Sequence, residues 1–348
     1  MIKSFGKAPE KEVINRSDQF QKGRFQNPVS TTAASLKDMP HVMGRYMRRK
    51  TEKAPTSAYK FEEANRDIIN VLDKTGIYLN WLGHAAVLIH AGGKYFLLDP
   101  MLGERASPFQ WMGPKRYAPS PIDPGKLPAI EAVVLSHDHY DHLDYPTILA
   151  LKGKVKKFIV PVGVSSHLEH WGVPKENIIE KDWWESFEGD GYTFTAAPAR
   201  HFSGRLFTRD NTLWCSWVLK FGESNIYFAG DSGYFDGYSE IGEKYGPFDM
   251  SLMPIGAYDP AWHDIHLNPE EAVEAFLQLQ GGQFYPTHWG TFDLALHSWY
   301  EPIKWLNELA DTHKIKTVTP APGEWVHLFD NPTDKNWWRK YSSELSLK

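Results

Sequence analysis

The densest group of side chains able to do chemistry is the segment SHDHYDH at residues 136–142. His137, His139, Asp141 and His142 directly follow an apolar stretch, AIEAVVL, that is typical of a buried strand. In extended backbone His137 and His139 share a face because side chains alternate with a period of two, while Asp141 and His142 can turn to a neighbouring point. Burying these polar groups without partners would be costly. Metal coordination satisfies them, so the segment predicts a site for two metals side by side.

Three more ligand-type side chains lie at the ends of predicted strands, each flanked by glycine or a small residue. They are His201 in APARHFSG, Asp231 in IYFAGDSGYF and His288 in FYPTHWGTF. Taken singly, a histidine after a strand is more often a hydrogen-bonded structural residue. Together with the 136–142 segment, the three predict the rest of the metal site. Cys215 is the only cysteine, so the ligands must be imidazoles and carboxylates, which suit Zn²⁺ but also iron or manganese.

The elements that must position these residues begin near Gly76. Short apolar runs separated by Gly and Pro predict strands, with a hairpin turn at Gly92–Gly93. Strands and helices then alternate, and the clearest helix begins at Pro269 after the cap Asn268. Two strand-rich halves each end in helices, which favours a mixed α/β architecture with sheets inside and helices outside. A short helix is expected near residues 61–74, and residues 61–348 are expected to form a single domain.

Composition describes an ordinary soluble globular chain of 348 residues, with 42% hydrophobic residues and a net charge of −5. Disorder, collagen and coiled coil are excluded as descriptions of the whole. No apolar run reaches the roughly 18 residues of a membrane-spanning helix. The opening residues also lack the apolar stretch of a secretory signal. The expected location is therefore the cytoplasm, with peripheral membrane contact left open.

Residues 1–60 stand apart as a basic N-terminal arm, with 13 Lys and Arg against 5 Asp and Glu. The densest patch, GRYMRRKTEK, places Arg48, Arg49 and Lys50 beside Tyr46 and Met47. Such an arm can contact anionic lipid head groups or nucleic acid, or be a solvated extension. Its charge pattern is too weak to indicate nucleic-acid binding, so no nucleic-acid partner is expected.

With all these motifs in view, the sequence resembles the metallo-β-lactamase superfamily of binuclear hydrolases. More narrowly, it is similar to the branch of N-acylphosphatidylethanolamine-hydrolysing phospholipases D. The similarity spans roughly residues 75–295 and rests on these motifs: WLGHAAVLI, LLDP, RASPFQWMGPKRY, SHDHYDHLDY, DWWE, GDSGYF, GPFDMSLMPIGAYDP and THWGTF. The resemblance implies an αβ/βα sandwich, with two mixed sheets inside and helices outside. It also implies two zinc ions per chain: one held by His137, His139 and His201, the other by Asp141, His142 and His288, with Asp231 bridging both.

The implied reaction is hydrolysis of N-acylphosphatidylethanolamine to N-acylethanolamine and phosphatidic acid by a hydroxide that bridges the metals. Asp141 is expected to orient the hydroxide, and His266 is the candidate donor of a proton to the leaving alcohol, with His263 as an alternative. The partner is then a phospholipid, and a homodimer would agree with the resemblance. An alternative is a binuclear hydrolase of a soluble phosphodiester, ester or lactone. A non-catalytic, metal-stabilised scaffold is disfavoured because a structural zinc needs only four closed ligands.

Four further residues remain open between functional and structural roles. His84 in LGHAA and Asp99 in LLDP are either partners of the metal ligands or plain turn residues. Lys115 and Arg116 in MGPKRY either pair with a phosphate or form a surface turn.

Overall fold

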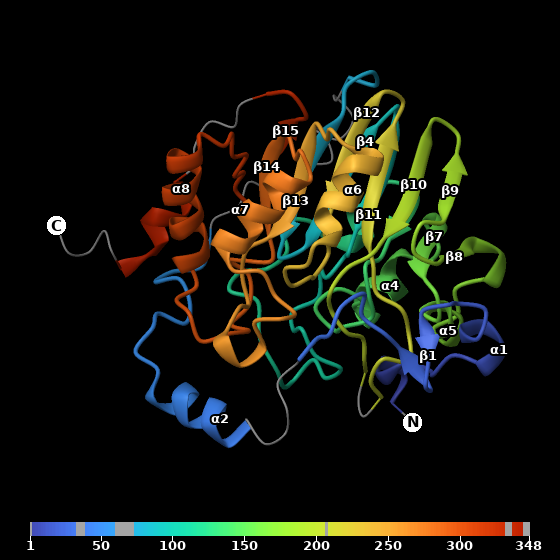
Figure 1. The fold of residues 1–348 in the computed structure, drawn as a ribbon, viewed down its shortest axis with the longest axis horizontal. Coiled ribbons are helices and arrows are strands. Elements are labelled where there is room, and N and C mark those ends of the chain that lie inside the picture. Colours follow the sequence, from blue (N-terminus) through green and yellow to red (C-terminus); the bar gives the residue numbers. More distant parts are fainter. Residues whose placement is uncertain (1, 33–38, 60–72, 206–207, 331–335, 344–348) are drawn as a thin grey trace.

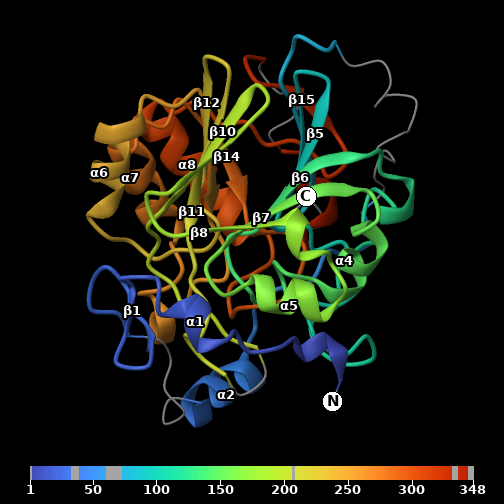
Figure 2. The same ribbon diagram turned by 90° about the vertical axis from the view of Figure 1, so that its right-hand side faces the viewer.

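The computed structural model describes residues 2–32, 39–59, 73–205, 208–330 and 336–343. The helix expected near residues 61–74 falls almost entirely outside these ranges. Two β-sheets face each other, and helices cover their outer faces (Figures 1 and 2). Figure 2 shows the layers edge-on, with α6, α7 and α8 outside one sheet and α4 and α5 outside the other. The predicted αβ/βα sandwich is therefore confirmed.

The first sheet has seven strands in the order β15-β3-β4-β5-β6-β7-β8. Its strands are β3 (Tyr78–Gly83), β4 (Ala86–Ala91), β5 (Lys94–Leu98), β6 (Ile130–Val134), β7 (Val155–Pro161), β8 (Ile178–Lys181) and β15 (Trp325–His327). The β4–β5 hairpin turns at Gly92 and Gly93, whose φ angles of 58° and 73° are those that glycine adopts readily. The predicted hairpin is confirmed. β5 to β8 run parallel to one another.

The second sheet has six strands in the order β14-β13-β12-β11-β10-β9. Its strands are β9 (Ser186–Gly189), β10 (Tyr192–Ala197), β11 (Ser216–Phe221), β12 (Ser224–Phe228), β13 (Met250–Pro254) and β14 (Gln283–Thr287). β12, β13 and β14 are parallel, and β10 points the same way because it is separated from β12 by the antiparallel β11. The sheet is mixed, because β9 to β12 pair antiparallel and β12 to β14 pair parallel.

The helices are short, and their ends follow sequence signals. They are α1 (Lys11–Ile14), α2 (Met39–Arg48), α4 (Tyr145–Leu151), α5 (Ser165–His170), α6 (Gly237–Tyr245), α7 (Pro269–Gln278) and α8 (Glu301–His313). The predicted cap of α7 is present as a capping box, in which Asn268 and Glu271 satisfy each other's backbone N–H groups. Within the described part of the chain, none of these helices has the length and apolar content needed to cross a bilayer.

The core is divided by the first sheet. Strand β4 is buried on both faces: Val87 and Ile89 point into the core between the sheets, while Ala86 and Leu88 point into a second core beneath α4 and α5. A strand with both faces covered reads as continuous apolar sequence, which is why AAVLIHA does not alternate with polar residues.

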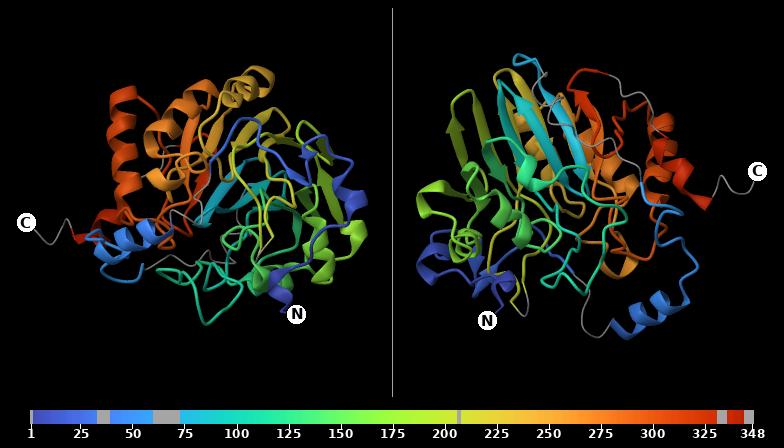
Figure 3. Two further views of the ribbon diagram at one scale, coloured as in Figure 1. Left: turned by 60° about the horizontal axis from the view of Figure 1, so that its bottom comes forward. Right: turned by 180° about the vertical axis from the view of Figure 1, so that it is seen from behind.

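The described parts of the basic arm pack against the sandwich, at its lower end in Figure 1 and in the right-hand view of Figure 3. Ile14 and Phe25 join the core between the sheets. The guanidinium of Arg49, just after α2, is almost fully buried and lies 2.7 Å from the Asp293 carboxylate. These contacts place the arm along the surface of the sandwich.

Candidate metal centre

The predicted ligands all lie in loops that follow the carboxyl ends of strands. His137, His139, Asp141 and His142 follow β6, His201 follows β10, Asp231 follows β12 and His288 follows β14. These strands end at the same edge of the sandwich, the position at which α/β proteins commonly build sites. Residues more than 150 positions apart in the sequence are thereby brought into contact.

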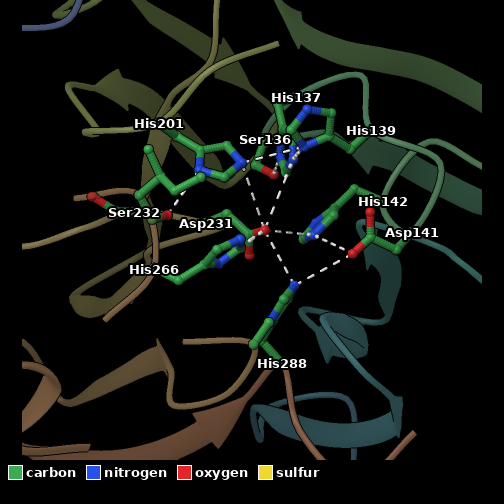
Figure 4. A network of polar contacts seen from close by, with 12 residues as sticks. Ser136, His137, His139, Asp141, His142, His201, Asp231, Ser232, His266 and His288 are labelled. Carbon is green, nitrogen blue, oxygen red and sulfur yellow. Dashed lines mark hydrogen bonds and ion pairs between the residues drawn. The ribbon is translucent and has the colours of Figure 1, made fainter. Parts of the chain in front are cut away.

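All seven predicted ligands form one cluster around the carboxylate of Asp231 (Figure 4). Asp231 Oδ2 lies 3.1 Å from His288 Nε2, 3.2 Å from His142 Nε2 and 3.7 Å from His201 Nε2. His139 Nδ1 is 2.8 Å from His137 Nε2 and 3.2 Å from His201 Nε2. Asp141 Oδ2 lies 3.4 Å from His288 Nε2. The structure thus brings together every residue that the sequence pattern selected.

Among the described residues, four overlapping groups of side chains have ligand atoms that lie within 4.8 Å of one another. One group is His137, His139 and His201, and a second is His84, Asp141, His142 and His288. Apart from His84, this is the division that the resemblance implies. Asp231 contacts members of both groups, so its carboxylate is placed to be shared.

Buried atoms without hydrogen-bond partners support a metal at this position. Among the described residues, His288 Nδ1 and Asp231 Oδ1 are buried without a hydrogen bond or ion pair, and His142 Nε2 and His288 Nε2 face only the carboxylates of Asp231 and Asp141. Each unsatisfied buried polar group costs about 1–3 kcal/mol, so two on one cluster indicate that something else engages them. Imidazole nitrogens and carboxylate oxygens are ligands for divalent metals, and the residues therefore fit a metal ion.

Neighbouring residues orient the ligands, and Asp99 is the centre of this support. His142 Nδ1 donates to Asp99 at 2.7 Å, and the Ser136 hydroxyl donates to the same carboxylate at 2.5 Å. Ser136 in turn lies 2.8 Å from His137 Nδ1. Both imidazoles therefore keep the Nε2 lone pair directed at the cluster, the usual arrangement around metal-binding histidines.

His84 supports the other side of the centre, where its Nε2 donates to Asp141 Oδ2 at 2.9 Å. From the sequence, His84 and Asp99 were either partners of the metal ligands or turn residues. In the structure, His84 hydrogen-bonds to Asp141 and Asp99 hydrogen-bonds to His142. Lys115 lies at the surface, as one of its two alternatives expected, whereas Arg116 is neither a phosphate partner nor a surface residue. Arg116 is buried and donates to the carbonyls of Met101 and Leu82, while exposed Lys115 pairs with Glu104.

The backbone is strained at the same place. His84, Asp99 and His288 have positive φ angles of 56°, 36° and 60°. Such conformations cost of order 1–3 kcal/mol each and concentrate at functional sites. Gly230, before Asp231, also has a positive φ of 60°, and a Cβ there would come within 2.5 Å of the Ser136 side chain. Glycine is thus required for the Asp231 loop to approach the 136–142 segment.

Opposite charges pair within the cluster. Burial opposes ionisation of Asp231, but the imidazoles of His142 and His288 outweigh it and hold the pKa well below the usual range. For His288, burial is likewise outweighed, because the carboxylates of Asp231 and Asp141 raise its pKa to about 9. For His137 and His201, burial dominates and lowers the pKa. The carboxylates likewise raise the pKa of His142, so without a metal His142 and His288 balance the carboxylates as imidazolium ions, and a bound metal ion would take the place of their protons.

His266 faces the cluster and His263 does not. His266 Nδ1 lies 3.8 Å from Asp231 Oδ2, and its ring stacks on that of His288. Burial lowers the pKa of His266 to about 4, so its imidazole is neutral near pH 7 in the empty site, and the negative charge of a bound phosphodiester would have to raise this pKa before His266 could donate a proton. His263 is 68% exposed and pairs with Asp264. Of the two histidines in this loop, only His266 can reach a substrate at the cluster.

A cavity of about 430 Å³ opens onto the cluster. Its floor contains His139, Asp141, Asp231, His266 and His288, and its walls are largely apolar. The walls are Ala106, Tyr140, Phe202, Arg209, Ala257, Trp262, Ile265 and Leu294. Sequence reasoning did not select these wall residues. Phe202 follows His201 in the sequence and Ile265 precedes His266. Their positions beside predicted site residues are the sequence feature that could have indicated them.

Comparisons with known proteins show the family of this chain. Residues 94–289 match the family model described as a beta-lactamase superfamily domain. An uncharacterised protein of Mycobacterium tuberculosis is 40% identical over 333 residues, covering 94% of this chain and 89% of that protein. N-acyl-phosphatidylethanolamine-hydrolyzing phospholipase D 1 of Caenorhabditis elegans is 34% identical over 311 residues, covering 83% and 87%.

Among solved structures, a metallo hydrolase from the archaeon Ignicoccus hospitalis has a TM-score of 0.56 and 22% identity, covering 73% of this chain and 98% of that one. This likeness supports the fold alone. The family match spans more than half of the chain and includes all seven clustered ligand residues. The chain belongs to the metallo-β-lactamase superfamily of metal-dependent hydrolases.

Proposed function

We propose that this protein is a zinc-dependent phosphodiesterase of the phospholipase D type. Its substrate would be N-acylphosphatidylethanolamine, and its products N-acylethanolamine and phosphatidic acid. The observation that carries the proposal is the apolar-walled cavity directly above the His/Asp cluster. A lipid phosphodiester needs apolar walls for its acyl chains and a metal site for its phosphate. The 34% identity to the phospholipase D of C. elegans supports the same substrate class.

In this proposal His137, His139 and His201 hold one zinc ion, and Asp141, His142 and His288 hold the other. Asp231 is shared between them. Two such ions supply Lewis acidity and activate water at neutral pH. Asp141, fixed by its hydrogen bond from His84, orients the attacking water. Phe202, Trp262 and Leu294 exclude bulk water and hold acyl chains.

His266 is the proposed donor to the leaving alcohol, and His266→Ala should lower turnover while leaving the metals bound. A donor to the leaving group contributes typically about 10²-fold or more. The loss should be large for a lipid alcohol and small for p-nitrophenolate, which leaves without help. Kinetics on both leaving groups and a metal assay test this, with exposed His263→Ala as the matched control. Equal losses on both substrates would remove the donor role from His266.

We further propose that the protein docks on a phospholipid bilayer through α2 and residues 105–116. α2 is fixed beside the cavity because Arg45 pairs with Asp259 through two contacts of 2.7 Å. Its outward side carries Met43, Tyr46 and Met47, the last 81% exposed. The 105–116 loop presents Trp111, 74% exposed, and Ala106 in the same loop lines the cavity.

Charge on the same surface favours anionic head groups. Arg48 and Lys50 are exposed, and in the described part of the chain neither has an ion pair. Apolar side chains flanked by such cations are typical of peripheral membrane surfaces. The surface borders the cavity, so a lipid head group could pass from the bilayer to the cluster.

Met47→Glu should weaken binding to vesicles of phosphatidylcholine with phosphatidylglycerol about 10-fold. Burying one methionine side chain contributes about 1.5–3 kcal/mol, and the new carboxylate adds repulsion. Leu277→Glu is the control, since Leu277 is likewise an exposed apolar side chain, at 51%, but lies on α7. Vesicle sedimentation measures both variants. If Met47→Glu binds like the parent protein, α2 is not the docking surface.

Turnover of metal-assayed protein tests the substrate itself. N-acylphosphatidylethanolamine in mixed micelles is compared with bis-p-nitrophenyl phosphate in buffer, each with and without chelator. Chelator-sensitive release of N-acylethanolamine is the expected result. Cleavage of the soluble diester alone would reject the lipid substrate and leave a binuclear hydrolase of small molecules.

A further inference from the structure

The N-terminal arm contains a small hairpin that reaches the metal centre. β1 (Phe20–Gln21) pairs antiparallel with β2 (Arg24–Phe25) across Lys22 and Gly23. Both turn residues have positive φ angles, 54° and 78°, as a two-residue hairpin turn requires. Phe25 is buried, packs edge-on against Phe20, and donates its N–H to the carbonyl of Asp210 at 2.8 Å. The hairpin is therefore anchored to the domain.

Two residues beyond the hairpin, Asn27 binds the backbone of a predicted metal ligand. Asn27 Nδ2 donates to the carbonyl of His201 at 2.6 Å, and the N–H of His201 donates to Asn27 Oδ1 at 2.9 Å. Elsewhere in the described ranges, no group bonds to the main chain of His201. A buried loop must satisfy its backbone groups, and at His201 the side-chain amide of Asn27 performs this task.

The His201 ring is fixed separately. Its Nδ1 donates to the carbonyl of Ile265 at 2.9 Å, which leaves Nε2 free of a proton and directed at His139 and Asp231. Since the ring and the backbone are held by different elements, the position of Nε2 depends on both. If the Asn27 amide is removed, the main chain of His201 is no longer held. The position of Nε2 is then no longer fixed, even though Nδ1 still donates to Ile265.

The next residues of the arm connect the same two loops. The Arg200 guanidinium donates to the Ser30 carbonyl at 2.9 Å and pairs with Asp264 at 2.8 Å. The N–H of Thr32 donates to Asp264 at 2.8 Å. Residues 27–32 thus link the loop that carries His201 to the loop that carries His266.

We infer that residues 20–32 are an integral part of the metal centre and that Asn27 is a positioning residue for His201. The inference rests on the metal cluster and not on the proposed substrate. It explains why Asn27, 174 residues before His201 in the sequence, makes two complementary hydrogen bonds with that ligand. Among the described residues, Asn27 makes no hydrogen bond with the 136–142 segment. Outer partners of metal ligands typically change metal affinity by about 10–100-fold.

The test is competition for Zn²⁺ between a chromogenic chelator and full-length Asn27→Ala. We expect at least one zinc to bind about 10-fold more weakly or worse, and the visible spectrum of the Co²⁺-substituted protein to change. Gln26→Ala is the matched control, because the Gln26 amide bonds only to Gln21 and Arg24 carbonyls within the hairpin. This control should retain parent Zn²⁺ affinity and the parent Co²⁺ spectrum.

Asn27→Asp provides a second variant of the same size. It can accept from the His201 N–H but cannot donate to the His201 carbonyl, so an intermediate loss of Zn²⁺ affinity is expected. Parent-like Zn²⁺ affinity and Co²⁺ spectra in both Asn27 variants would overturn the inference. Equal weakening in Gln26→Ala would also overturn it, since the effect would then be general destabilisation of the arm. Neither readout depends on substrate, so failure of the proposed function would leave this result unaffected.

Discussion

Replacing Asp231 with asparagine should abolish nearly all hydrolysis and lower the metal content of the purified protein. Asparagine keeps the shape of the side chain but removes the charge that lies within 3.2 Å of both His142 and His288. Because Asp231 contacts both groups of ligands, a single change weakens both metal positions. Loss of an outer partner costs up to about 100-fold, so losing a shared ligand should exceed that. Elemental analysis and kcat/KM on a phosphodiester measure the two effects.

Asp236→Asn is the matched control for this experiment. Asp236 lies five residues further along, is exposed, and makes no capping hydrogen bond to α6. It should retain activity and full metal content. If Asp231→Asn keeps two metals and parent turnover, Asp231 is not the shared ligand.

Removing the metals should have an equally large effect, on both activity and stability. A chelator should stop hydrolysis completely, and zinc should restore it; parallel additions of iron and manganese would identify the metals that also serve. The metal-free protein should unfold at a lower temperature, because a ligand at 1,000 times its Kd stabilises the folded state by about 4 kcal/mol. His288 Nδ1 and Asp231 Oδ1 would then remain buried without a partner.

Calorimetry of the parent, metal-free and zinc-restored protein checks this second prediction. Chelator premixed with excess zinc is the control for effects of the chelator itself. Undiminished turnover in protein shown by elemental analysis to be free of metal would contradict a metal-dependent reaction. An unchanged unfolding temperature would instead show that the cluster does not couple metal binding to folding.

Local patterns in the sequence predicted much of the fold. The hairpin at Gly92–Gly93, the buried strand before His137 and the cap at Asn268 all depend on neighbouring residues, and all are present. Such features are encoded within a few residues, because backbone conformation and side-chain period are local properties. The ligand residues were selected in the same way, from residue type and position at strand ends.

Contacts between distant segments could not be predicted in this way. The sequence allowed Arg116 to be a phosphate ligand, but its guanidinium donates to the backbone carbonyls of Met101 and Leu82. Nothing near Asn27 indicated that its amide would hold His201, and the apolar cavity walls come from separate loops. Each of these depends on which loops meet once the two sheets have packed.

The sequence by itself therefore indicated the hairpin at Gly92–Gly93, the strand before His137, the start of α7 and the seven side chains of the cluster. Only the tertiary structure decided which of them touch, which neighbours orient them, and that the arm reaches the centre. The physical reason is that ligand type and strand end are properties of a short segment, whereas a distance such as that between Asp99 and His142 is set by the packing of the whole sandwich.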